Sequence, residues 1–260
     1  MAIAAPHASP DGGWDTYRAA YQALPLDGTR ERTFVILGTS HYGAPDRFGL
    51  TRKQFVTPFG AARTDVDLVN ELESAAGDAI RMEDYCHAVE HSIEFQIVFL
   101  QHLYGSNVRV LPILCGPFVK SIYEGGLPEE NDRIARFFDA LGNIGARENQ
   151  RLFWVLGVDM THIGRRYGDP LRATANIGEM LAIEERDRER IRQIAAADTR
   201  AYWSLVQEGN DDLKWCGSAP FYTFMKVMPG LHGELAHYHQ WQIDPHSVVT
   251  FGAMRFDRAE

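Results

Sequence analysis

Three apolar segments of the chain each end in a histidine. They read AIAAPH, TFVILGTSH and LFWVLGVDMTH, and they end at His7, His41 and His162. A short apolar segment that stops at a Gly, Pro or Ser and then presents an imidazole is typical of a buried strand that delivers a side chain to its carboxyl end, where α/β sheets build their sites. We therefore expect the three histidines to share one pocket.

Cys216, in the segment KWCGSAPFY, is a fourth candidate for this pocket. The residues after it can start a helix, whose amide groups and dipole would favour a thiolate. Imidazole and thiolate groups together suit iron, copper or zinc, and a nearby carboxylate favours iron. The first choice of metal ligands is His7, His41 and Cys216. Asp159 and His162 are expected to support these ligands or to replace one of them.

A competing pattern lies at His87-Ala-Val-Glu90-His91, which has the H-x-x-E-H form of the inverzincin metalloproteases. On one helix, His87 and His91 would lie one turn apart and bind zinc, with Glu90 as a general base. The motif is short and often occurs by chance. It stays an alternative to the first ligand set.

The composition limits the class of protein. The chain has 260 residues, and its hydrophobic content of 45% is ordinary for a globular protein. Its formal net charge of -9 disfavours a general nucleic-acid surface. Its cysteines, Cys86, Cys115 and Cys216, are too few for a disulfide framework and fit a reducing cytoplasm. The sequence has no recognisable signal peptide or long apolar segment, so we expect a soluble cytoplasmic protein without a membrane partner.

Apolar periodicity and turn residues predict that strands and helices alternate along the chain. Strands are expected at 2–6, 33–38, 108–114, 152–158, 232–243 and 247–256. Helices are expected at 10–24, 65–76, 90–104, 132–141, 179–208 with a break near 197–198, and 220–228. Loops are expected at 25–30 and 117–130. This alternation predicts one α/β domain over residues 1–260, with a mostly buried β-sheet flanked by helices.

Several segments spread over nearly the whole chain carry a family resemblance. They are APHA at 5–8, VILGTSHYG at 35–43, TPFG at 57–60, EHSIEFQ at 90–96, FLQHL at 99–103, VDMTH at 158–162 and CGSAP at 216–220. In these segments the chain resembles the Memo family, also called AmmeMemoRadiSam system protein B. The resemblance implies a fold similar to the class III extradiol ring-cleaving dioxygenases, in which one domain holds non-haem iron at one end of a mixed sheet.

The resemblance also implies roles for particular residues. The metal ligands of the family fall on His7, His41 and Cys216, and its pocket aspartate and histidine fall on Asp159 and His162. The histidine of the EHSIE segment is His91, which the resemblance places near the same pocket. His162, Asp159 and His91 are accordingly the predicted catalytic residues, and the inverzincin interpretation becomes less favoured.

Two departures from the family pattern lie close to the first ligand. Family members usually read APHAGY, whereas this chain reads APHASPDGGW, which predicts a different loop over His7. Members also usually carry a segment with a G-x-W-Y signature before the APHA strand, and this segment is expected to be absent here. Both departures predict a more open pocket.

These observations predict a mononuclear metal protein that acts on a small molecule of unknown identity. Fe(II) is the favoured metal, with copper or zinc as alternatives, and no organic cofactor is expected. The predicted reaction is a dioxygenase-type oxidation, with His162 or His91 as acid or base and Asp159 orienting an imidazole. One alternative is zinc-dependent hydrolysis. The other, which the family resemblance implies, is non-catalytic binding of metal or a phosphopeptide, for which Arg165 and Arg166 could hold an anion. The resemblance also implies radical-SAM and AMMECR1-type partner proteins.

Overall fold

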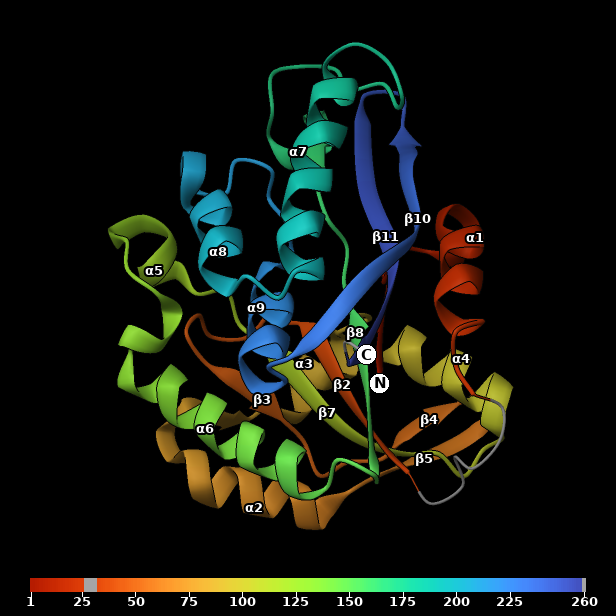
Figure 1. Ribbon diagram of the computed structural model, residues 1–260. Coiled ribbons are helices and arrows are strands. Elements are labelled where there is room, and N and C mark those ends of the chain that lie inside the picture. Colours follow the sequence, from red (N-terminus) through yellow and green to blue (C-terminus); the bar gives the residue numbers. More distant parts are fainter. Residues whose placement is uncertain (26–31, 259–260) are drawn as a thin grey trace.

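A mixed β-sheet forms the centre of the computed structural model, which describes residues 1–25 and 32–258 (Figure 1). In the sheet, β2 (Thr33–Thr39) lies between β7 (Arg109–Cys115) and β8 (Leu152–Gly157), and the three strands are parallel. β1 (Ala2–Ala5) is parallel to β8 and antiparallel to β11 (Ser247–Arg258). The carboxyl ends of β1, β2 and β8 therefore meet at one edge of the sheet.

Antiparallel and short strands extend the sheet on both sides. β10 (Leu231–Asp244) forms a long antiparallel hairpin with β11 at one side. The short strands are β3 (Phe48–Leu50), β4 (Phe55–Thr57), β5 (Gly60–Thr64), β6 (Ile80–Met82) and β9 (His162–Gly164). β3 runs antiparallel to β7 and parallel to β6, while β9 runs antiparallel to β11. The predicted α/β class with a mixed, helix-flanked sheet is thereby confirmed.

Helices cover both faces of the sheet (Figure 1). They are α1 (Pro10–Tyr21), α2 (Val66–Ala76), α3 (Asp84–Val89), α4 (Glu94–Tyr104), α5 (Val119–Glu124), α6 (Asp132–Arg147), α7 (Glu179–Ala195), α8 (Thr199–Gln207) and α9 (Ser218–Val227). Alternate side chains of β2 enter two hydrophobic clusters: Val35 packs with residues of α2, α6 and α9, and Phe34 packs with residues of α1 and α4. A strand buried on both faces explains the continuous apolar run in the sequence.

Three expectations about elements need correction. The helix predicted over 90–104 is α4, which begins only at Glu94 because Glu90 is extended. The helix α3, which ends at Val89, was not predicted. The loop predicted over 117–130 contains α5 and a short 3-10 turn at Pro128–Glu130. The short strands β3 to β6 and β9 were not predicted. The break expected near 197–198 is confirmed, since Asp198 caps α8 with a side-chain hydrogen bond.

The turn expected at 25–30 lies, apart from Pro25, outside the described residues. Among residues 1–25 and 32–258, the helices are all too short or too polar to cross a membrane.

Candidate metal centre

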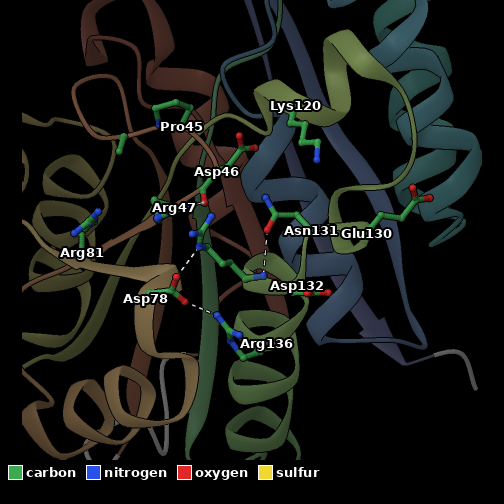
Figure 2. A pocket seen from close by; sticks show the side chains of 12 residues that line it. Pro45, Asp46, Arg47, Asp78, Arg81, Lys120, Glu130, Asn131, Asp132 and Arg136 are labelled. Atoms are coloured by element: carbon green, nitrogen blue, oxygen red, sulfur yellow. Dashed lines mark hydrogen bonds and ion pairs between the residues drawn. The ribbon is translucent and has the colours of Figure 1, made fainter.

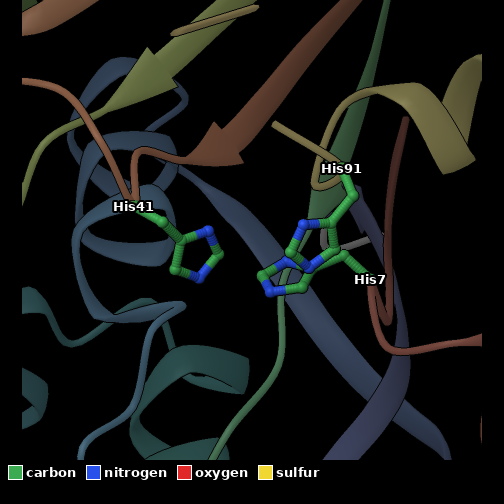
Figure 3. A group of neighbouring side chains, drawn as sticks. All are labelled: His7, His41 and His91. Carbon is green, nitrogen blue, oxygen red and sulfur yellow. The ribbon is translucent and has the colours of Figure 1, made fainter. Parts of the chain in front are cut away.

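His7, His41 and His91 meet at the edge where β1, β2 and β8 end (Figure 3). His7 follows β1, His41 follows β2, and His91 lies in the connection between α3 and α4. One ring nitrogen from each histidine lies within 4.8 Å of those of the other two. The ring centroids of His7 and His41 are 5.2 Å apart, and those of His41 and His91 are 5.3 Å apart. Three imidazoles this close together could hold one metal ion.

The ring of His7 is oriented by the end of β8. Its Nδ1 lies 2.9 Å from the carbonyl oxygen of Gly157, which can only accept a hydrogen bond. Nδ1 therefore carries the proton, and Nε2 keeps a free lone pair. Burial lowers the pKa of His7 and outweighs the opposite effect of Asp159, so the ring is neutral at neutral pH. A neutral imidazole with a free Nε2 is the form that binds metals.

Glu90 holds the other two histidines in place. Its side chain accepts hydrogen bonds from Nδ1 of His41 at 2.9 Å and from the backbone N–H groups of His41 and His91, both at 2.9 Å. Burial by itself raises the pKa of Glu90, but the hydrogen bonds from His41 and the backbone lower it to about 2. The ionised carboxylate fixes the proton of His41 on Nδ1 and leaves Nε2 free. Metal-binding histidines are commonly held by a carboxylate in this way.

Two glycines allow the connection that carries His91 to reach the sheet. A Cβ atom on Gly157 would lie 2.0 Å from the carbonyl oxygen of Ser92, and one on Gly38 would lie 2.6 Å from the Ser92 hydroxyl. Gly157 is the last residue of β8, and Gly38 is the next-to-last residue of β2. The close approach of Ser92 therefore requires glycine at both strand ends.

The inverzincin interpretation of His87, Glu90 and His91 is wrong. α3 ends at Val89 and Glu90 has extended backbone angles, so His87 and His91 do not lie one turn apart on a helix. The ring of His87 is buried elsewhere, and its Nε2 donates to the carbonyl oxygen of Gly49 at 3.2 Å. Glu90 positions His41 instead of serving two zinc-bound histidines.

Cys216 lies beside His7. Its Sγ is 3.4 Å from Nε2 of His7 and 3.5 Å from the carbonyl oxygen of Asp159. The hydroxyl of Thr39, at the end of β2, donates to the carbonyl oxygen of Cys216 at 2.8 Å and ties the two segments together. Burial raises the pKa of the Cys216 thiol well above its ordinary value. A bound metal cation would instead lower the pKa of Cys216, because a thiol that coordinates a metal is deprotonated.

Asp159 and His162 lie next to these residues. Oδ1 of Asp159 accepts the backbone N–H of His7 at 2.9 Å, and its Oδ2 is 3.6 Å from Nε2 of His7. Nδ1 of His162 donates to the carbonyl oxygens of Met160 at 2.9 Å and Lys214 at 3.2 Å. Burial lowers the pKa of His162, with the charge of Asp159 acting in the opposite direction. His162 is therefore a neutral base with its Nε2 free.

The roles of Glu90 and of the glycines at the strand ends were not predicted from the sequence. The H-x-x-E-H pattern did draw attention to Glu90, but a role in holding His41 depends on a contact between residues far apart in the chain. Glycine at the end of a strand is a usable signal for the close approach of another segment. Gly38 and Gly157 both lie at the end of a strand and therefore gave this signal in the sequence.

A cleft of about 670 Å³ lies in a different region, between the loop after β2 and the start of α6 (Figure 2). Charged side chains of both signs line it. They are Asp46, Arg47, Asp78, Arg81, Lys120, Glu130, Asp132, Arg133 and Arg136. Asp78 pairs with Arg133 at 2.6 Å and with Arg136. The predicted ligands and catalytic residues do not line this cleft, so it is separate from the histidine cluster.

Comparisons with known proteins agree with the fold and with the segments that surround the histidines. A family model described as Memo-like protein matches residues 1–255. A MEMO1 family protein of Thermococcus kodakarensis is 31% identical over 243 residues, which cover 90% of this chain and 78% of that protein. A MEMO1 family protein of Aquifex aeolicus is 26% identical over 258 residues, which cover 98% of this chain and 63% of that protein.

A solved structure gives an independent likeness of fold. It is that of an uncharacterized protein of Escherichia coli K12, with a TM-score of 0.55 at 10% sequence identity, and the match covers 97% of this chain and 98% of that one. At this identity the likeness concerns the fold alone. The family model, in contrast, extends over almost the entire sequence, and the chain belongs to the family of Memo-like proteins.

Proposed function

We propose that the protein is a mononuclear metal protein that uses Fe(II) to oxidise a small molecule. The observation that carries this proposal is the convergence of His7, His41 and His91, with the Nδ1 protons of His7 and His41 donated to fixed acceptors. The Cys216 thiol lies beside His7. Because the rings of His7 and His41 are both held with Nε2 unprotonated, the site is arranged for a metal before any metal binds.

Two ligand sets are compatible with this arrangement, and both contain His7 and His41. The third ligand is His91, whose ring nitrogen lies within 4.8 Å of those of the other two histidines, or Cys216, as expected from the sequence, whose Sγ lies 3.4 Å from Nε2 of His7. Imidazole and thiolate donors fit iron, copper and zinc. Iron in such a site supplies the redox chemistry by which dioxygen oxidises an organic substrate.

Two residues of the chain are suited to move protons there. His162 is a neutral base whose Nδ1 is occupied by two carbonyl oxygens, so its Nε2 is the atom that would accept a proton from a substrate. Asp159 holds the backbone of His7 and thereby the distance between the ligands and this base. We assign His162 as the general base and Asp159 as the residue that positions His7.

The proposal is tested by metal analysis of protein purified anaerobically without added metal. The parent protein is expected to contain iron in equimolar amount, and His41→Ala is expected to lose it. His102→Ala is the matched control, because His102 is an exposed histidine on α4 outside the site. Iron retained by His41→Ala would overturn the ligand assignment, and equimolar zinc without iron would overturn the redox assignment.

The two ligand sets are separated by comparing Cys216→Ser with His91→Ala. Cobalt(II) is a suitable probe because its bond to a thiolate gives an intense absorption band in the near ultraviolet. If Cys216 is the third ligand, Cys216→Ser loses this band and binds cobalt more weakly, while His91→Ala keeps the band. If His91 is the third ligand, the parent shows no thiolate band, His91→Ala binds cobalt(II) more weakly, and Cys216→Ser binds it as the parent does.

A further inference from the structure

Asp187 is a fully buried carboxylate in the middle of α7, at 0% exposure. Its Oδ1 accepts hydrogen bonds from the Thr161 hydroxyl at 2.6 Å and the Trp215 indole N–H at 2.7 Å. Its Oδ2 accepts from the Tyr238 hydroxyl at 2.7 Å and the Thr250 hydroxyl at 2.6 Å. A carboxylate out of water must be paired or fully hydrogen-bonded, and these four donors occupy the acceptor sites that its two oxygens offer.

Both donors to Oδ1 are sequence neighbours of the candidate metal centre. Thr161 directly precedes His162 and lies two residues after Asp159, while Trp215 directly precedes Cys216. The Trp215 N–H also lies 3.2 Å from the Thr161 hydroxyl oxygen. One carboxylate oxygen therefore joins the segment that carries Asp159 and His162 to the segment that carries Cys216.

α7 holds Trp215 through a second residue. The guanidinium of Arg190, three residues after Asp187, lies 5.3 Å from the ring of Trp215 and pairs with Asp211 at 2.8 Å. Arg190 is itself buried, and it also donates to the carbonyl oxygen of Leu205 at 2.9 Å. A buried arginine with these partners has little freedom to move. The indole of Trp215 is thus fixed by both its N–H group and its ring.

The same contacts set the distance between two predicted ligands. Asp159 holds the backbone of His7, and Cys216 Sγ lies 3.4 Å from Nε2 of His7. This distance depends on how the 159–162 and 215–216 segments are placed relative to each other. Backbone hydrogen bonds join these segments directly, from Gly217 to Asp159 and from His162 to Leu213, both at 3.0 Å, and Oδ1 of Asp187 adds a side-chain link through Thr161 and Trp215. We propose that Asp187 is a positioning residue for the metal centre and holds Cys216 against His7. The inference rests on the proposed function.

Two substitutions separate this role from general stability. Trp215→Phe and Tyr238→Phe each remove one donor to Asp187 and keep an aromatic ring, but only Trp215 adjoins Cys216. Trp215→Phe is expected to lower the affinity for cobalt(II) by about tenfold or more and to shift the thiolate absorption band. Tyr238→Phe is expected to keep the parent's affinity and spectrum. Urea unfolding of both variants shows whether the native fold is retained.

The carboxylate itself is tested by two substitutions of Asp187. Asp187→Ala removes all four hydrogen bonds and is expected to weaken cobalt(II) binding. In Asp187→Asn, the amide oxygen can still accept from Trp215 and Thr161, and the hydroxyls of Tyr238 and Thr250 can rotate to accept from the amide nitrogen. Asparagine is therefore expected to restore most of the affinity and the band. If Asp187→Ala does not fold, the Trp215→Phe comparison still decides.

A measurement on metal-free protein tests the role of Asp187 even if the protein does not bind the proposed metal. In metal-free protein, alkylation of Cys216 by iodoacetamide, followed by peptide mass spectrometry, is expected to be several-fold faster in Trp215→Phe than in the parent or Tyr238→Phe. Equal alkylation rates together with equal cobalt(II) affinities would overturn the role of Asp187. A parent protein without a Cys216-dependent cobalt band would instead overturn Cys216 as ligand, and the alkylation rates would still decide whether Asp187 positions it.

Discussion

Glu90 is the residue on which the orientation of the candidate centre depends most directly. It is 2% exposed, and its two oxygens accept hydrogen bonds from the ring of His41 and from the backbone of His41 and His91. A charged carboxylate is needed, because all of these partners are donors. A neutral glutamine of the same shape has only one oxygen and cannot accept all of these hydrogen bonds.

Glu90→Gln should therefore weaken metal binding while leaving the fold intact. Its amide nitrogen would face one of the donors from His41 or His91, so the ring of His41 would lose its fixed orientation. Loss of such a supporting carboxylate typically lowers metal affinity by about 10–100-fold. Cobalt(II) titration measures the change.

Glu129→Gln is the matched control for that substitution. Glu129 also accepts hydrogen bonds, from Tyr222 at 2.6 Å and Lys226 at 2.9 Å, but it lies outside the candidate centre. The Glu129→Gln variant should bind cobalt(II) with the affinity of the parent protein. Equal affinities in Glu90→Gln and the parent would show that Glu90 does not organise the site.

Gly157 connects a single position to the packing of two elements. Its Cβ would meet the carbonyl oxygen of Ser92 at 2.0 Å and Nε2 of Gln96 at 3.0 Å. Gly157→Ala should push the connection before α4 away from β8 and move His91, with a loss of about 1–3 kcal/mol in the free energy of unfolding. Urea denaturation measures this loss.

Gly142→Ala provides the contrast. Gly142 lies inside α6, and its Cβ would have no neighbour closer than 3.8 Å, so alanine should stabilise the protein by about 0.4–1 kcal/mol. If both alanines had the same effect, the close approach of Ser92 to β8 would not be the cause of the loss at Gly157.

The elements differ in how far local sequence could predict them. β1, β2 and β8 are apolar runs with clear ends, so their positions and the histidines after β1 and β2 were predictable. The break between α3 and α4 was not, because the apolar stripe of Ile93, Ile97 and Leu100 predicts α4 but contains no signal for how the residues before it fold. That break depends on contacts between distant segments, above all those that Glu90 makes with His41.

His87, on α3, should make the free energy of unfolding depend on pH. The ring is buried, Nε2 donates to Gly49, and Nδ1 has no hydrogen-bond partner within residues 1–25 and 32–258. Burial lowers the pKa of His87 from 6.5 to about 4. The unfolded chain takes up this proton near pH 6.5 and the folded protein only near pH 4, so the free energy of unfolding should fall as the pH decreases through this window.

The expected loss from His87 is roughly 3 kcal/mol between pH 6.5 and pH 4, at about 1.4 kcal/mol for each unit of pKa difference. His87→Gln keeps a donor for Gly49 but does not titrate there, so its stability should depend less on pH. Urea unfolding at several pH values compares the two proteins. Parallel pH profiles would rule out His87 as a source of the effect.

In the whole molecule, the site joins parts of the chain that are far apart in sequence. His7 and Cys216 are separated by 209 positions, yet their side chains lie 3.4 Å apart. The fold class and the meeting of His7 with His41 were predictable, because parallel strands present their carboxyl ends at one edge. The third histidine of the cluster is His91, from the connection between α3 and α4, and not His162, the third histidine that follows an apolar run. The choice between Cys216 and His91 as third ligand was not predictable, since it depends on side-chain placement that sequence spacing does not encode.

Because these segments separate on unfolding, metal binding should stabilise the entire fold. A metal that binds only the native protein adds about 2.7 kcal/mol to the free energy of unfolding when its free concentration is one hundred times Kd. Urea unfolding with and without cobalt(II) should show this gain in the parent and in His102→Ala, and a chelator should abolish it. His41→Ala should show no gain, because one of the shared ligands is missing. An equal gain in His41→Ala would mean that the metal stabilises the protein from a different place.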